Sequence, residues 1–197
     1  MSEAILKIIK CVAAFALIPV VVGVAKSFHA EFMDIKHMYA AFRWGVATYL
    51  FVHLFIYVPQ GLYNFGQKVF NDIFRFVPVL GGTVGSMVPL YTTLSLIVLY
   101  LGTTLLNVRG LESTLMFLAG LTLTMHVILT AQELREEDAQ VIKAHYFLMV
   151  IIAFIVNILL VAWLLDINYT KFAFPHFFKE AVAQSKLIYR DVFDVIR

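Results

Sequence analysis

Five stretches of this sequence lack Asp, Glu, Lys and Arg, and their lengths approach or exceed one crossing of a lipid bilayer. A bilayer core about 30 Å thick needs around 20 apolar residues per helix. Of the whole chain, 61% is hydrophobic and 14% is charged, whereas a soluble domain carries roughly 25% charged residues. We therefore predict an all-α, polytopic transmembrane bundle over residues 1–169, with five spans near residues 5–25, 44–66, 87–107, 113–133 and 144–166.

Two of the five stretches depart from a simple span. The first is short, but Lys7 and Lys10 can lengthen it by placing their ammonium groups among the lipid headgroups. The third is too long, and its first half contains Gly81, Gly82 and Gly85. The simpler interpretation is a break at these glycines, followed by one helix. The alternative is a re-entrant stretch over residues 77–86, which needs protein or a water-filled cavity around its backbone.

Amphipathic segments accompany the spans. Between the first two, aromatic residues such as Phe28, Phe32 and Phe42 recur every three to four positions, with charged residues between them. This spacing predicts a helix that lies at the membrane interface. A second such segment follows near residues 69–77. The third is the C-terminal segment 170–197, for which we predict an amphipathic interfacial helix with one apolar face, formed by Phe178, Ala181, Val182, Ser185, Ile188, Val192 and Ile196.

Charge gives the expected orientation. With five spans, nine of the 15 Lys and Arg residues lie on the side of the C-terminus and six on the other side. Because basic residues are in excess on the cytoplasmic side of membrane proteins, this difference favours a cytoplasmic C-terminus.

Several function classes lack their signatures. The net charge of +2 is small and the basic residues are dispersed, so we expect no nucleic-acid partner. The single cysteine, Cys11, allows no intrachain disulfide. The sequence contains no zinc-protease motif, no nucleophile elbow and no Walker loop. An enzyme is therefore the less favoured class, and we predict no catalytic or metal-binding residues.

Histidines are the ionisable residues within the predicted spans. His53 lies in the second span and His126 in the fourth, while His145 begins the fifth and His37 precedes the second. Imidazoles on facing helices can hold haem b, so we regard His53, His126 and His145 as haem candidates. The alternative is a neutral imidazole hydrogen-bonded to a neighbouring helix, and the unequal depths of His53 and His126 favour this alternative.

These features lead to three hypotheses of function. The first is a non-catalytic integral membrane subunit or scaffold whose partners are the lipid bilayer and other membrane subunits or further copies of the chain. The second is a b-type haem subunit that exchanges electrons with quinone. The third is a channel or transporter component in which the glycines of residues 81–85 line a pore.

Overall fold

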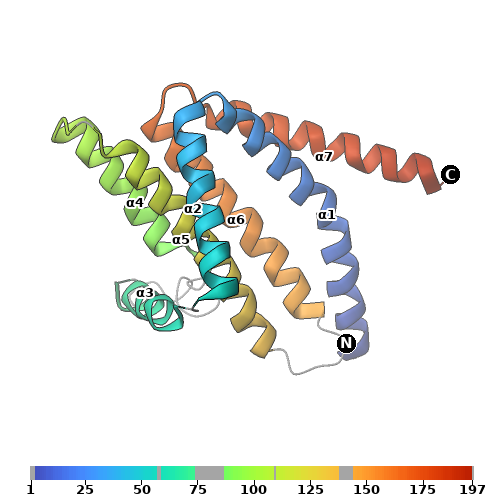
Figure 1. Cartoon of the computed structure of the whole chain (residues 1–197). Coiled ribbons are helices and arrows are strands. Elements are labelled where there is room, and N and C mark those ends of the chain that lie inside the picture. Colours follow the sequence, from blue (N-terminus) through green and yellow to red (C-terminus); the bar gives the residue numbers. More distant parts are fainter. Residues whose placement is uncertain (1–2, 57–58, 74–86, 109, 138–143, 197) are drawn as a thin grey trace.

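The computed structural model describes residues 3–56, 59–73, 87–108, 110–137 and 144–196, and within these ranges it contains helices and no strands (Figure 1). The predicted all-α class is confirmed. In chain order, the elements are α1 (Glu3–Met33), α2 (Lys36–Phe55), α3 (Gln60–Ile73), α4 (Leu90–Tyr100), a π-helical turn η2 (Leu101–Leu105), α5 (Glu112–Glu137), α6 (Ala144–Asn168) and α7 (Phe174–Ile196).

Three of the described helices are long and apolar enough to cross a membrane. They comprise Ile5–Met33, Glu112–Glu136 and Ala144–Asn168, and a shorter apolar helix covers Leu90–Leu105. These three helices correspond to the first, fourth and fifth predicted spans. The structure thus supports a membrane protein with three candidate spans and does not establish the predicted number of five.

The predicted second span, residues 44–66, is not one helix. Helix α2 ends at Phe55 and α3 begins at Gln60, immediately after Pro59. Proline lacks the backbone N–H of a helix interior and disfavours helical geometry in the residue before it. Hydropathy does not register this break because the residues on both sides of it are apolar.

The third predicted span, residues 87–107, is helical over Leu90–Leu105. Its last turn is the π-helical η2, and the chain then leaves the helix at Asn107, which has a positive φ of 50°. Asparagine tolerates this left-handed conformation better than most residues, so it commonly ends helices. The predicted re-entrant stretch, residues 77–86, lies outside the described residues.

The first predicted amphipathic helix is also wrong, because its aromatic residues face protein. A turn after Met33 divides the segment between α1 and α2. Phe28, Phe32 and Phe42 lie on either side of this turn and are buried. Their rings meet edge to face, with centroids 5.4 Å apart for Phe28 and Phe32 and 5.2 Å apart for Phe32 and Phe42, a favourable arrangement for aromatic pairs.

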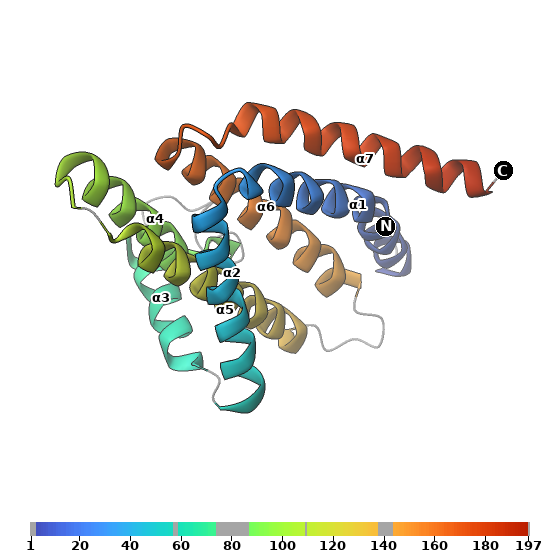
Figure 2. The ribbon, with the colours of Figure 1, turned by 45° about the horizontal axis from the view of Figure 1, so that its top comes forward.

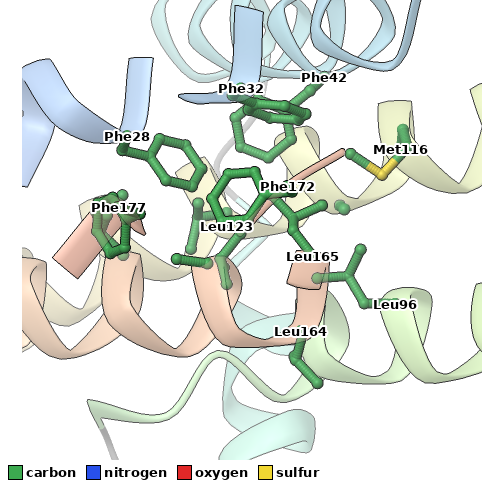
Figure 3. Packing of buried hydrophobic residues seen from close by; sticks show 14 of the residues in the cluster. Phe28, Phe32, Phe42, Leu96, Met116, Leu123, Leu164, Leu165, Phe172 and Phe177 are labelled. Carbon is green, nitrogen blue, oxygen red and sulfur yellow. The ribbon is translucent and has the colours of Figure 1, made fainter. Parts of the chain in front are cut away.

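Two further rings from the α6–α7 region complete this cluster. Phe172 lies 6.1 Å from Phe28, and Phe177 lies 6.2 Å from Phe28, between ring centroids (Figure 3). We call Phe28, Phe32, Phe42, Phe172 and Phe177 the aromatic cluster. It joins the end of α1, the start of α2 and the start of α7 in one core.

Helices α2 and α5 cross with their backbones in contact. A Cβ atom added to Gly45 would overlap the Phe117 carbonyl oxygen and lie 2.7 Å from the Leu121 nitrogen. A Cβ atom added to Gly120 would overlap the Phe42 carbonyl oxygen in the same way. Small residues permit such close approach between membrane helices, so the two glycines fix the position of α2 on α5.

Helix α7 packs along α1 (Figure 2). Ala181 and Ser185 are buried against Gly23, where a Cβ atom would lie 2.8 Å from the Ala181 carbonyl oxygen. The helix predicted within residues 170–197 is therefore present as α7. Its buried face includes Phe177, whereas Phe178, which we expected on that face, is 49% exposed.

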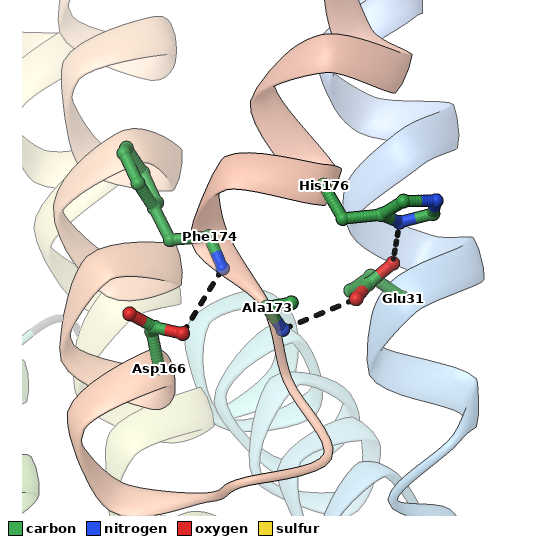
Figure 4. A network of polar contacts seen from close by, with 5 residues as sticks. All are labelled: Glu31, Asp166, Ala173, Phe174 and His176. Carbon is green, nitrogen blue, oxygen red and sulfur yellow. Dashed lines mark hydrogen bonds and ion pairs between the residues drawn. The ribbon is translucent and has the colours of Figure 1, made fainter.

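Two carboxylates hold the start of α7. The backbone N–H of Ala173 donates to Glu31 Oε1 at 3.1 Å, and that of Phe174 donates to Asp166 Oδ1 at 3.1 Å (Figure 4). Glu31 Oε2 also lies 2.8 Å from Nδ1 of His176. Negative charge at a helix N-terminus satisfies free N–H groups and is favoured by the helix dipole. Carboxylates of α1 and α6 thereby fix where α7 begins.

Tyr169, directly after α6, gives a prediction of alkaline sensitivity. Burial, and secondarily the negative charge of Glu112, raises the pKa of its hydroxyl. In the unfolded chain, tyrosine loses its proton near pH 10. The stability that depends on neutral Tyr169 is therefore complete below about pH 10 and is lost as the pH rises above that value. We expect Tyr169→Phe to lose less thermal stability between pH 9 and pH 11 than the wild type, and equal losses would contradict this assignment.

Candidate functional site

A cavity of about 530 Å³ lies between α1, α2, α5 and α6. Helices α1 and α2 diverge from their shared turn (Figures 1 and 2), while the glycine crossing keeps α2 on α5. The cavity occupies the region between these diverging helices. It is lined by Ala25, Phe28, His29, Phe32, Tyr39, Phe42, Arg43, Val46, Ala47, Leu50, Leu123, Thr124, Val127, Ile128, Phe154 and Ile158.

Most of the cavity wall is apolar. The one polar side chain that α5 and α6 contribute to the lining is Thr124, and its hydroxyl donates to the Gly120 carbonyl oxygen of its own helix at 2.8 Å. The wall formed by α5 and α6 therefore offers no free side-chain hydrogen-bond donor. A molecule against this wall would be held by dispersion and by removal from more polar surroundings.

The polar groups of the cavity come from the parts of α1 and α2 close to their turn. The hydroxyl of Tyr39 and Nδ1 of His29 lie 2.7 Å apart. The guanidinium carbon of Arg43 lies 5.4 Å from the centroid of the Tyr39 ring, within the range of a cation–π interaction. We call His29, Tyr39 and Arg43 the polar rim.

His126, a predicted haem candidate, belongs to a buried polar chain on another face of α5. Its Nε2 lies 3.5 Å from Thr130 Oγ1, which lies 3.0 Å from the Tyr63 hydroxyl. Tyr63 in turn donates to Glu133 Oε2 at 2.7 Å. His126, Thr130 and Tyr63 are all buried. The chain connects α3 to α5, which is the role of interhelical hydrogen bonds in membrane bundles.

The space beside His126 is small. Its cavity has a volume of about 10 Å³, enough for about one water molecule. The hydrogen-bonded alternative for His126 describes surroundings of this kind, and haem binding stays a prediction.

The other two haem candidates have different surroundings. His53 stacks on Tyr49 of its own helix at a centroid distance of 5.8 Å, and Nδ1 of His145 lies 3.4 Å from Nζ of Lys10. No described ring contact or hydrogen bond joins any two of His53, His126 and His145. Across the described ranges, no group of three or more His, Cys, Asp or Glu side chains is arranged to hold a metal ion.

No pattern in the sequence indicates the cavity directly. The spacing of Phe28, Phe32 and Phe42 predicts a helix at the membrane interface, whereas these side chains line the cavity from the protein side. A useful signal was the position of Arg43 immediately before an apolar run, because a charged group beside hydrocarbon needs a partner.

Fold and site together describe a helical membrane protein with an apolar cavity and a polar rim. No family model matches the sequence, and no curated protein or solved structure shows significant similarity to it.

Proposed function

We propose that this chain is a non-catalytic integral membrane subunit that binds the hydrocarbon part of a lipid in the cavity between α1, α2, α5 and α6. The observation that carries the proposal is the cavity itself. Its volume of about 530 Å³ falls in the range of roughly 300–1,000 Å³ that is typical of ligand sites. An apolar wall without contacts loses dispersion energy, so a lipid chain is the favoured occupant.

The surroundings of the cavity supply such chains. Three of its four helices, α1, α5 and α6, are long and apolar enough to cross a membrane. If these helices cross the membrane, part of the cavity lies at the depth of the bilayer hydrocarbon, which consists mainly of lipid acyl chains.

Five crossings remain our proposal for the topology, with α2 and the segment Leu90–Leu105 as the second and third. The apolar part of α2, residues 44–55, extends about 18 Å at 1.5 Å per residue, so the proposed second crossing also includes apolar residues that follow α2 in the predicted span 44–66. With five crossings, the excess of basic residues favours a cytoplasmic C-terminus.

The subunit part of the proposal is supported by apolar surface outside the cavity. Ile8, Val12 and Phe15 on α1 are about 60% exposed. Other membrane subunits or a second copy of the chain would cover this surface together with lipid. Native mass spectrometry tests this directly, because a particle much heavier than the 22.4 kDa chain retains partners. An absorption spectrum of the same particle tests the haem hypothesis, since bound haem gives a Soret band.

Filling the cavity gives the decisive test of lipid binding. Ala47 lines the cavity, so we expect Ala47→Trp to displace bound lipid and lower its retention at least fivefold, as measured by native mass spectrometry. Ala40→Trp is the matched control, because Ala40 is an exposed residue of the same helix outside the lining. Equal lipid retention by the two variants would overturn the proposal.

A further inference from the structure

The cavity is polar at one end and apolar elsewhere. The polar rim lies on the parts of α1 and α2 nearest their turn, whereas the wall from α5 and α6 offers no free side-chain hydrogen-bond donor. This distribution matches a molecule with a polar headgroup and a hydrocarbon chain. A uniformly apolar molecule fits this distribution less well, because the polar side chains of the rim would find no polar partner on it.

Arg43 gives the rim its charge. Its side chain is exposed, and among the residues that the structure describes no carboxylate forms an ion pair with it. The Tyr39 ring lies beneath the guanidinium group, at 5.4 Å, which limits the positions that the guanidinium samples. Arginine presents a planar set of N–H donors that matches phosphate geometry.

The groups beside Arg43 are also suited to a phosphate. The Tyr39 hydroxyl and Nδ1 of His29 lie 2.7 Å apart and share one hydrogen bond, which leaves one other N–H or O–H of the pair free to donate to a ligand. Among the described residues, no carboxylate side chain lines this cavity, so none of these lining groups would repel an anion.

The level of the rim in the membrane agrees with this chemistry. Arg43 lies immediately before the apolar run that begins at Trp44, and His29 follows the apolar run that ends at Ala25. Side chains at such boundaries reach the headgroup region of a bilayer. A lipid in the cavity would thus meet the rim with its headgroup and the α5–α6 wall with its chain.

We propose that this cavity selects a phospholipid with a net negative headgroup, whose phosphate binds Arg43 with Tyr39 and His29 beside it. The inference rests on the proposed function, because it names the class of lipid that the same cavity holds. The Tyr39 ring positions the guanidinium, and the headgroup then determines which lipids are retained.

The experiment compares two lipids that differ only in their headgroups. Full-length protein is stripped of lipid in detergent and titrated with phosphatidylglycerol or phosphatidylcholine of identical acyl chains, and binding is measured by native mass spectrometry. A single basic side chain near a membrane surface contributes enough for a roughly fivefold preference. We expect that preference for phosphatidylglycerol in the wild type and a preference below twofold in Arg43→Gln.

Two matched variants separate this inference from the proposed function. Lys186→Gln removes an exposed positive charge of α7 outside the cavity and is expected to keep the preference. Ala47→Trp is expected to weaken the binding of both lipids by the same factor. If the wild type binds neither lipid, the proposed function fails. If it binds both lipids equally, or if Arg43→Gln keeps the preference, only the headgroup inference is overturned.

A competition with inorganic phosphate identifies the source of the anion. We expect phosphate at a concentration equal to that of the lipid to leave phosphatidylglycerol bound, because the chain contributes most of the affinity. Displacement of the lipid by phosphate alone would overturn the assignment of the rim to a lipid headgroup.

Discussion

Replacing Gly45 with alanine is expected to destabilise the protein by about 3 kcal/mol or more, the upper end of the cost of overpacking. The added Cβ would overlap the Phe117 carbonyl oxygen and approach the Leu121 nitrogen. Both are backbone atoms of α5, so no side-chain rotation can relieve the clash. The measurement is the thermal unfolding midpoint of the purified protein in detergent.

Gly61→Ala is the matched control. A Cβ atom at Gly61 in α3 would have no neighbouring atom within 4 Å. Alanine also favours helix relative to glycine by roughly 0.5–1 kcal/mol, so we expect the control to be neutral or slightly more stable. If the two alanine variants unfold at the same temperature, α2 and α5 do not cross at Gly45.

Replacing Phe32 with alanine is expected to cost about 3–5 kcal/mol, the usual range for a buried phenylalanine. Phe32 has no exposed surface and contacts the rings of Phe28, Phe42 and Phe172. For a chain of this size, the unfolding midpoint shifts by roughly 2–4 °C per kcal/mol.

The same variant tests whether the aromatic cluster holds α7 in place. Loss of the Phe32 ring weakens the contact of Phe172 with α1, so trypsin should cleave at Arg190 faster than in the wild type. Phe193→Ala provides the control, because this ring of α7 is 66% exposed and should affect neither stability nor cleavage. An unchanged cleavage rate in Phe32→Ala would show that α7 is held by other contacts, such as those of Glu31 and Asp166.

Hydropathy located several helices well. The predicted fourth and fifth spans, residues 113–133 and 144–166, fall within α5 and α6. The charged residues that bound these runs lie within about one turn of the helix ends, although α5 continues past Glu133 to Glu137. A membrane helix cannot bury unpaired charges cheaply, so charges gather near its ends. Periodicity also placed Ala181 and Ser185 on one face of the C-terminal helix, and both are buried against α1.

Hydropathy was less informative where apolar residues lie on both sides of a break. It joined α2 and α3 into one span across Pro59, and it assigned the aromatic residues around the α1–α2 turn to a membrane surface. Among the histidines, hydropathy identifies His126 as an unusual group within a span, but it does not show that the space beside this side chain is only about 10 Å³.

The sequence by itself determined the class of this protein. The chain is 61% hydrophobic and has long uncharged runs, and in a membrane such a chain can satisfy its backbone hydrogen bonds only as helices or a closed barrel. The lengths of the uncharged runs indicated helices. Only the tertiary structure decided which apolar side chains face protein, which enclose the cavity and which remain exposed. The physical reason is that lipid and protein interior are similarly apolar, so a phenylalanine in the aromatic cluster and one facing acyl chains leave the same pattern in the sequence.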